Sequence, residues 1–190
     1  MKKFYLSLMA VTIFSMLAYA QPKLDKNTFG DIQLRNIGPA VMSGRISAVD
    51  ALISDPRIIY VATAGGGIYK SENGGTTFKQ VFDDEIQAVG EIRIDQKHPD
   101  TIWAGTGEPW TRNSTSVGNG IYLSKDGGKT WKNKGLEKTE RFSYIKIDPD
   151  NSNIVYAGAL GPLWNASEER GLYKTTDSGE TWEKVLYVDE

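Results

Sequence analysis

Short runs of alternating hydrophobic and polar positions recur along most of this chain. Three of them, RISAVDALISDP, EIRIDQKHP and YIKIDPD, each lead into a turn that contains proline. A second apolar run that ends in glycine follows each one, then a short aromatic run, a polar turn and a last run. Period-2 alternation bounded by turn residues is typical of β-strands. The pattern therefore predicts three units of four short strands each.

The units recur at about fifty residues, a spacing typical of propeller repeats. A four-stranded antiparallel sheet of this kind cannot bury both faces alone, so the sheets must stack. We predict an all-β fold, with about three blades of an incomplete six- to eight-bladed β-propeller. We expect the propeller at 31–190, with an extra strand at about 31–39 and blades at about 43–82, 86–136 and 141–188. Since three blades cannot close such a ring, we expect an N-terminal piece of a longer protein.

The three polar turns have matching sequences, SENGGTTF, SKDGGKTW and TTDSGETW. A short polar side chain at the third position bonds the backbone of a tight turn, and glycine at the fifth position adopts a positive φ without penalty. The hydroxyl at the first position adds hydrogen bonds, and the aromatic residue at the eighth packs over the turn and begins the outermost strand. We interpret the turns as structural rather than catalytic. Their key residues are Ser71, Asn73, Gly75 and Phe78, then Ser124, Asp126, Gly128 and Trp131, then Thr175, Asp177, Gly179 and Trp182.

The N-terminal sequence predicts export. Lys2 and Lys3 precede an apolar run that ends in Ala18-Tyr19-Ala20, which is the pattern of a secretory signal peptide over 1–20. A retained membrane anchor is the weaker alternative because the run is short for a membrane span. We expect a linker over 21–30, a periplasmic or extracellular location, and no membrane span after signal cleavage. The chain has no cysteine, so it has no disulfide framework.

Charge and composition argue against several kinds of function. The formal net charge is −2, with 22 basic and 24 acidic residues interspersed, so a nucleic-acid partner has no basic surface to bind. His98 is the single histidine and lies in a turn, which argues against a catalytic triad or a histidine metal site. We interpret DPDNSN at 148–153 as an Asx turn rather than a calcium loop. We expect neither a metal nor a cofactor.

The polar turns resemble the Asp-box, or BNR, repeat of bacterial sialidases, xyloglucanases and the sortilin luminal domain. Longer stretches, including LRNIGPAVMSGRI and GTGEPWTRNSTSVGNGIY, are similar to exported bacterial sortilin-type propeller proteins, many of which are labelled glycosyl hydrolase. The resemblance covers the chain after the signal peptide. It implies a propeller fold, but a label that follows the repeat does not by itself imply a reaction.

The sequence departs from two of these families at functional positions. Xyloglucanases carry a catalytic Asp in a stretch that matches Thr63 to Tyr69, where this chain has Ala64, and an alanine cannot transfer a proton. Sialidases begin their first blade with Arg-Ile-Pro. Arg45-Ile46-Ser47 keeps that arginine but loses the proline, and the resemblance makes Arg45 a candidate anion contact. The alternative is an arginine at a strand end, paired with a neighbouring acid.

Consecutive antiparallel strands alternate in direction, so the loops between second and third strands share one face and the polar turns share the other. The loops at 107–120 and 161–170 are long, whereas the loop at 64–67 is tight. Unequal insertions on one face indicate a binding face. The candidate ligand-binding residues are Arg45, Glu108, Trp110, Arg112, Asn113, Trp164, Glu168 and Arg170.

Aromatic rings with nearby charges and amides suit either a sugar or an extended peptide. Alternatively, the tryptophans fill gaps between blades and the charges are solvated. Glu108 with Glu168 or Glu169 offers a carboxyl pair for a glycosidase, but no motif specifies it and we assign no catalytic residue. We expect a scaffold that binds an extracellular or periplasmic peptide, protein or glycan. The alternative is a sialidase-like or xyloglucanase-like glycoside hydrolase with catalytic acids largely outside this segment.

Overall fold

The computed structural model describes residues 44–112 and 115–187. The predicted signal peptide, linker and extra strand at 31–39 lie outside the described residues. Across these two ranges, no helix combines the length and the apolar character that a membrane crossing requires.

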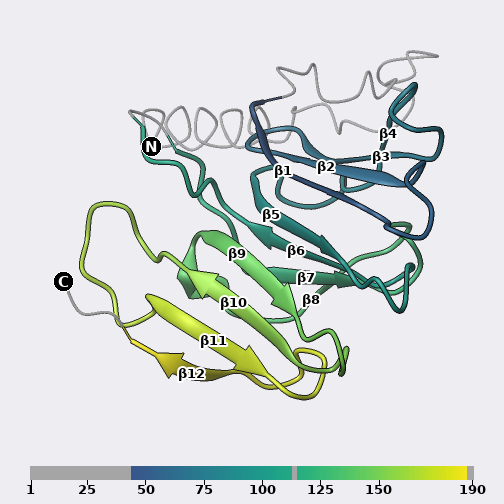
Figure 1. Cartoon of the computed structure of the whole chain (residues 1–190). Coiled ribbons are helices and arrows are strands. Elements are labelled where there is room, and N and C mark those ends of the chain that lie inside the picture. The colour runs from purple at the N-terminus through teal and green to yellow at the C-terminus, as the bar shows by residue number, and fades with distance from the viewer. Residues whose placement is uncertain (1–43, 113–114, 188–190) are drawn as a thin grey trace, which may run out of the picture. The chain divides into compact units, whose positions relative to one another are not determined.

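The described chain forms three antiparallel sheets of four strands, and in each sheet the strands lie side by side in chain order (Figure 1). A 3-10 turn, η1 (Glu137–Thr139), lies between the second sheet and the third. The fold is therefore all-β and consists of about three propeller blades, as the alternation predicted. The strands are β1 (Ile46–Ala51), β2 (Ile59–Thr63), β3 (Gly67–Ser71) and β4 (Lys79–Gln80) in the first blade, β5 (Val89–Ile94), β6 (Ile102–Thr106), β7 (Ile121–Ser124) and β8 (Lys132–Asn133) in the second, and β9 (Phe142–Ile147), β10 (Val155–Ala159), β11 (Gly171–Thr175) and β12 (Glu183–Leu186) in the third.

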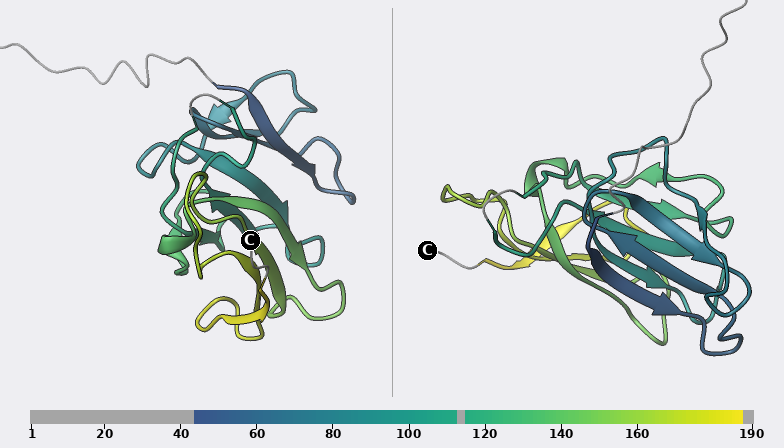
Figure 2. Two further views of the ribbon diagram at one scale, coloured as in Figure 1. Left: turned by 90° about the vertical axis from the view of Figure 1, so that its left-hand side faces the viewer. Right: turned by 90° about the horizontal axis from the view of Figure 1, so that it is seen from above.

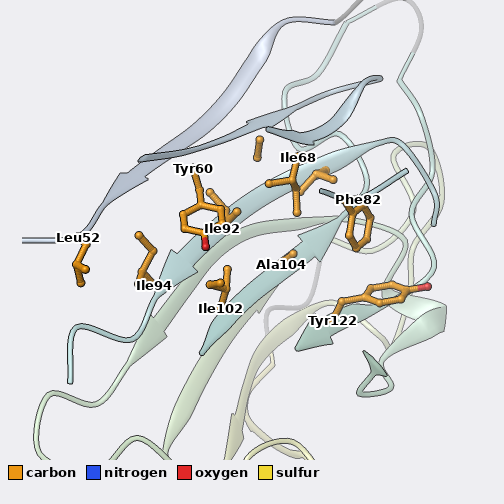
Figure 3. Close-up of a cluster of buried hydrophobic side chains, with 11 residues drawn as sticks. Leu52, Tyr60, Ile68, Phe82, Ile92, Ile94, Ile102, Ala104 and Tyr122 are labelled. Atoms are coloured by element: carbon orange, nitrogen blue, oxygen red, sulfur yellow. The ribbon is translucent and has the colours of Figure 1, made fainter. Parts of the chain in front are cut away.

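Apolar side chains fill the space between successive sheets. Tyr60 and Ile68 of the first blade meet Ile92 and Ile102 of the second in one buried cluster (Figure 3). A second cluster, which includes Trp103, joins the second blade to the third. The second blade is thus covered on both faces, so every residue of β6 is buried. This double coverage explains why β6 is almost wholly apolar rather than alternating.

The first strands of the three blades lie next to one another, β1 beside β5 and β5 beside β9. The succession of sheets is also visible in the two turned views of Figure 2. Polar side chains connect these inner strands. The Ser47 hydroxyl donates to the Val89 carbonyl at 2.6 Å, and the Asp50 carboxylate accepts from the Ile94 N–H at 2.8 Å. Arg93 Nε donates to the Ile145 carbonyl at 3.2 Å.

The outermost strands of the first two blades are shorter than the sequence suggested. TFKQVF and TWKNKG each contribute only two residues to a strand, β4 and β8. In the first blade, Phe82 leaves the sheet edge and is buried edge-on against Tyr122 and Trp131 of the second blade, with ring centroids 5.3 and 5.1 Å apart. Burying an aromatic ring contributes more than a few exposed edge hydrogen bonds.

The three polar turns have the same internal hydrogen bonds. The fifth-residue N–H donates to the first-residue hydroxyl at 2.9 Å in each turn. The seventh-residue N–H donates to the carboxylate or amide oxygen of the third residue, also at 2.9 Å. The fifth-position glycines have φ between 79° and 86°, which favours glycine as predicted. The fourth residue also has a positive φ, including Ser178 at 59°.

All three polar turns are bonded to their own blade, and the second and third are also bonded to the preceding blade. In each turn, the N–H of the fourth residue donates to a carbonyl in the turn between the first two strands of the same blade, at 3.0 to 3.1 Å. In addition, the indole N–H of Trp131 donates to the Val81 carbonyl at 2.6 Å, and that of Trp182 to the Lys134 carbonyl at 2.8 Å. Both acceptors belong to the outer edge of the preceding blade. Trp131 and Trp182 therefore join neighbouring blades.

The first prediction concerns this joining role. We expect Trp131→Ala to lower the free energy of unfolding by about 3 kcal/mol, because it removes a ring between two blades and its hydrogen bond. Phe78 is the equivalent residue of the first blade and is 46% exposed, so Phe78→Ala serves as the control. It should cost less than about 1 kcal/mol. Urea unfolding measures both, and equal costs would show that the aromatics stabilise only their own turns.

A second prediction follows from the acidic residues of the turns. Hydrogen bonds from the Thr130 hydroxyl and backbone lower the pKa of Asp126 from 3.8 to about 2. Those from the Thr181 and Thr175 hydroxyls hold the pKa of Asp177 well below its usual range. Because the folded pKa of Asp126 is lowered, its carboxylate stabilises the fold above the ordinary pKa. That contribution is lost as the pH falls from 3.8 toward about 2.

Asp126→Asn keeps the accepting oxygen, as Asn73 does in the first turn, but removes the titration. We expect the melting temperature of this variant to fall less than that of the parent between about pH 5 and about pH 2.5. Asp83→Asn, at an exposed position outside the polar turns, is the matched control. An identical fall for the parent and Asp126→Asn would contradict the assignment.

Candidate functional site

The two long loops, 107–120 and 160–170, leave their sheets at the end opposite the polar turns. In Figure 1 the β10–β11 loop projects on the left, whereas the turns between β11 and β12 lie on the right. The short connection 64–66 and the N-terminal ends of β1, β5 and β9 lie at the same end as the long loops. We refer to this end as the loop face.

Glu108 is the centre of an ionic cluster on the loop face. It lies two residues after the end of β6, its N–H donates to the Ser116 carbonyl at 2.9 Å, and only 3% of the residue is exposed. Its carboxylate forms an ion pair with Arg45 of the first blade. The Nε of Arg112 lies 3.7 Å from Glu108 Oε1. Three predicted site residues from different parts of the sequence therefore come together. Arg45, at the start of a strand, also pairs with an acid, which is the alternative interpretation of this residue.

Both arginines remain partly accessible although they share a buried carboxylate. The side chain of Arg45 is 43% exposed and that of Arg112 is 52% exposed. The carboxylate pairs with Arg45 and lies 3.7 Å from Arg112 Nε, while part of each arginine side chain remains accessible to solvent. Such groups can donate hydrogen bonds to a ligand without a large loss of side-chain entropy, because the protein already holds them in place.

Arg141 is a buried arginine that our sequence analysis missed. Its Nη1 donates to the Glu140 carboxylate at 2.7 Å and to the Gly161 carbonyl at 3.2 Å, and Nη2 lies 3.3 Å from the Thr115 hydroxyl. It occupies the same repeat position as Arg45, since the carbonyl of each accepts from the residue that follows the second strand of its blade. Alignment of Arg45-Ile46-Ser47 with Arg141-Phe142-Ser143 would have revealed it.

Close backbone packing fixes both ends of the 107–120 loop. The Gly107 N–H donates to the Ala88 carbonyl and the Gly118 N–H to the Glu140 carbonyl, each at 2.7 Å. A Cβ atom at Gly107 would lie 2.0 Å from the Glu140 oxygen, and one at Gly118 would lie 2.4 Å from the Gly107 nitrogen. Only glycine fits these two positions, so the loop starts and ends at defined places.

The two candidate tryptophans are exposed. Trp110 is 66% exposed on the first long loop and Trp164 is 79% exposed on the second. Neither ring therefore fills a gap between the three described blades. By contrast, Trp103, Trp131 and Trp182 lie at the blade junctions.

The remaining candidates have different environments. Arg170 Nε donates to the Leu160 carbonyl at 2.7 Å and Nη2 to the Pro162 carbonyl at 2.9 Å, so this arginine holds the base of the second long loop. Glu168 is exposed, and its backbone carbonyl accepts from Lys184 Nζ. Asn113 lies outside the described residues.

Glu91 is a buried carboxyl group that the sequence pattern concealed, because it reads as one residue of the strand EIRI. It accepts from the Ile92 N–H at 3.1 Å, and Arg93 Nη2 lies 3.2 Å from Oε1. Burial raises the pKa of Glu91, and the charge of Arg93 opposes that rise. Among the described residues, no group of three or more His, Cys, Asp or Glu side chains is arranged to hold a metal ion.

The third prediction separates the two sides of the central ion pair. Arg45→Ala leaves a buried carboxylate with a longer contact to Arg112, so we expect a loss of about 2 to 3 kcal/mol in unfolding free energy. Glu108→Gln releases two partly exposed arginines that water can solvate, and should cost about 1 kcal/mol. The double variant should cost less than the sum, which a double-mutant cycle by urea unfolding measures. Additive costs would show that the pair is not coupled.

The sequence of this chain is similar to parts of known xyloglucanases. The oligoxyloglucan-reducing end-specific xyloglucanase of Emericella nidulans is 26% identical over 151 residues, which covers 70% of this chain and 16% of that protein. A xyloglucanase of a Paenibacillus species is 25% identical over 203 aligned residues, which covers 97% of this chain and 19% of that protein. This chain therefore spans less than a fifth of the length of either relative.

Solved structures and a family model agree with the fold. The crystal structure of an ancestral GH74 enzyme matches with a TM-score of 0.56 at 23% identity, over 76% of this chain and 19% of that one. That similarity shows a shared propeller fold. The family model Sortilin-Vps10, described as sortilin, neurotensin receptor 3, matches residues 66–188. Since this match covers more than half of the chain, the chain belongs to the sortilin/Vps10 family of β-propeller proteins.

Proposed function

We propose that this chain is part of an exported β-propeller scaffold that binds an extended glycan on its loop face. The observation that carries the proposal is the exposure of Trp110 and Trp164 on two neighbouring long loops. Exposed indole rings are available to stack on the apolar face of a sugar ring.

The ionic cluster supports the same proposal. Arg45 and Arg112 are held by buried Glu108 and remain partly exposed, so they can donate hydrogen bonds to sugar hydroxyl groups. Two relatives of this chain are named xyloglucanases, and that name favours a glycan over a peptide or protein as the ligand. A peptide remains the competing ligand class, since aromatic anchors suit both.

Export is part of the proposal. It rests on the signal-peptide pattern over 1–20, with a linker over 21–30 and propeller blades over 31–190. We place the protein in the periplasm or outside the cell, where glycan ligands are available.

Glycoside hydrolysis is the second candidate function. Glu91 favours it, because burial raises the pKa of this carboxyl group and a general acid in a glycosidase needs a raised pKa. Glu108 is a poorer acid candidate because it is already engaged by Arg45. A hydrolase would take its other catalytic acids from blades outside this chain, as the short coverage of the relatives allows.

The fourth prediction tests the two functions together. Isothermal titration of the full chain with xyloglucan oligosaccharides should show binding, and Trp110→Ala with Trp164→Ala should weaken it by about tenfold or more. Trp131→Phe, at a blade junction, is the matched aromatic control and should bind as the parent does.

A reducing-sugar assay on the same samples decides the second candidate. Release of reducing ends that Glu91→Gln abolishes would replace the scaffold by a hydrolase. Binding of peptides but not of oligosaccharides would replace the ligand class. Absence of any effect of the two tryptophan changes would refute the loop face as the binding site.

A further inference from the structure

The polar turns border two grooves on the outer edge of the propeller, at the end opposite the loop face. The first rim groove has a volume of about 450 Å³ and is lined by Lys70, Glu72, Lys79 and Lys129, among others. The second rim groove has a volume of about 280 Å³ and is lined by Lys125, Lys132, Lys134 and Glu180, among others. Lys129 and Lys125 belong to the same polar turn of the second blade, so the two grooves are adjacent.

Each rim groove contains one ion pair that neutralises one of its lysines. In the first, Lys70 Nζ lies 2.8 Å from Glu72 Oε1, and in the second, Lys134 Nζ lies 2.5 Å from Glu180 Oε1. Lys70 and Lys134 are the more buried lysines, with side chains 18% and 6% exposed. The Lys134 pair connects the second blade to the polar turn of the third, whereas the Lys70 pair lies within the first blade.

The other two lysines of each groove are not paired with a carboxylate within 44–112 or 115–187. Lys79 and Lys129 in the first groove, and Lys125 and Lys132 in the second, are exposed, and no carboxylate of the described residues lies within ion-pair distance of them. The positive charges of Lys79 and Lys129 add to that of Lys70 in lowering the pKa of Glu72. Lys132 likewise adds to Lys134 in lowering the pKa of Glu180.

The arrangement has a cost that an anionic ligand would offset. Like charges gathered in a concave groove repel one another, and the walls of the groove focus their field. Four exposed ammonium groups in two adjacent grooves fit anionic groups spaced along a chain, because a lysine binds as a point charge and demands no fixed orientation. A membrane surface is too broad to enter grooves of this size.

We propose that the two rim grooves bind an acidic polysaccharide, with the carboxylates of successive uronic acid units on Lys79, Lys129, Lys125 and Lys132. A single-stranded nucleic acid fits less well, because such ligands bind by stacking bases on exposed aromatic rings. Stacking of successive bases would need an exposed ring in each groove. Phe78 in the first groove is 46% exposed, but Trp131 in the second groove is already packed against Phe82 of the preceding blade. This site is separate from the loop face and does not depend on the function proposed there.

Polygalacturonate is the test ligand, and the full chain is titrated with it at low and at physiological salt. We expect binding that weakens steeply as salt rises, since the contacts are exposed ion pairs. Changing Lys79, Lys129, Lys125 and Lys132 together to Gln should weaken binding by about tenfold or more. The matched control changes Lys97, Lys138, Lys146 and Lys174 to Gln, which removes the same charge elsewhere on the surface.

Three outcomes would overturn the proposal. They are no binding of polygalacturonate at low salt, an equal loss of affinity in the two quadruple variants, and equally tight binding of single-stranded DNA or of anionic phosphatidylglycerol vesicles. The Trp110→Ala and Trp164→Ala variants distinguish this site from the loop face, because they should bind polygalacturonate as the parent does. Far-UV circular dichroism and the melting temperature confirm that each quadruple variant is folded.

Discussion

The hydrogen bond from the indole of one blade to the outer edge of the preceding blade is the contact on which this propeller depends. A four-stranded sheet is stabilised when it packs an apolar face against a neighbouring sheet. Apolar packing alone would allow the sheets to slide or splay. The bonds from Trp131 to Val81 and from Trp182 to Lys134 fix the outer edges, and the polar contacts between β1, β5 and β9 fix the inner ones. Blade spacing is thereby defined at both margins.

The two ends of the propeller have different roles, since the polar-turn end is structural and the loop face is the candidate binding surface. The polar-turn end satisfies its backbone groups internally, through bonds that repeat in all three blades. The loop face instead carries residues that differ between blades, with Arg45 and Arg141 in the first and third and Ala88 in the second. A regular frame can therefore present an irregular surface, because loops between second and third strands do not alter blade stacking.

Local chemistry explains which features could be predicted from the sequence. The polar turns close through bonds over four residues or fewer, so Asp126 and Gly128 could be assigned from the repeat alone. The positions of the strands could be predicted from the alternation of apolar and polar residues. The length of β4 could not, because Phe82 leaves the sheet edge to pack on the next blade. The pair between Arg45 and Glu108 depends on how two blades stack, and no spacing in the sequence encodes it. Glu91 looked like an ordinary strand residue because its burial arises from neighbouring blades.

The glycines at the two ends of the 107–120 loop bear on how this surface can change over time. Gly107 and Gly118 sit so close to neighbouring backbone that no side chain fits, whereas Trp110 and Val117 between them are exposed. The loop is thus anchored at its two ends, and its exposed residues can be substituted without changing that anchoring. Lineages of this family, or protein engineers, can replace its residues and acquire a new ligand while the frame beneath keeps its blade spacing.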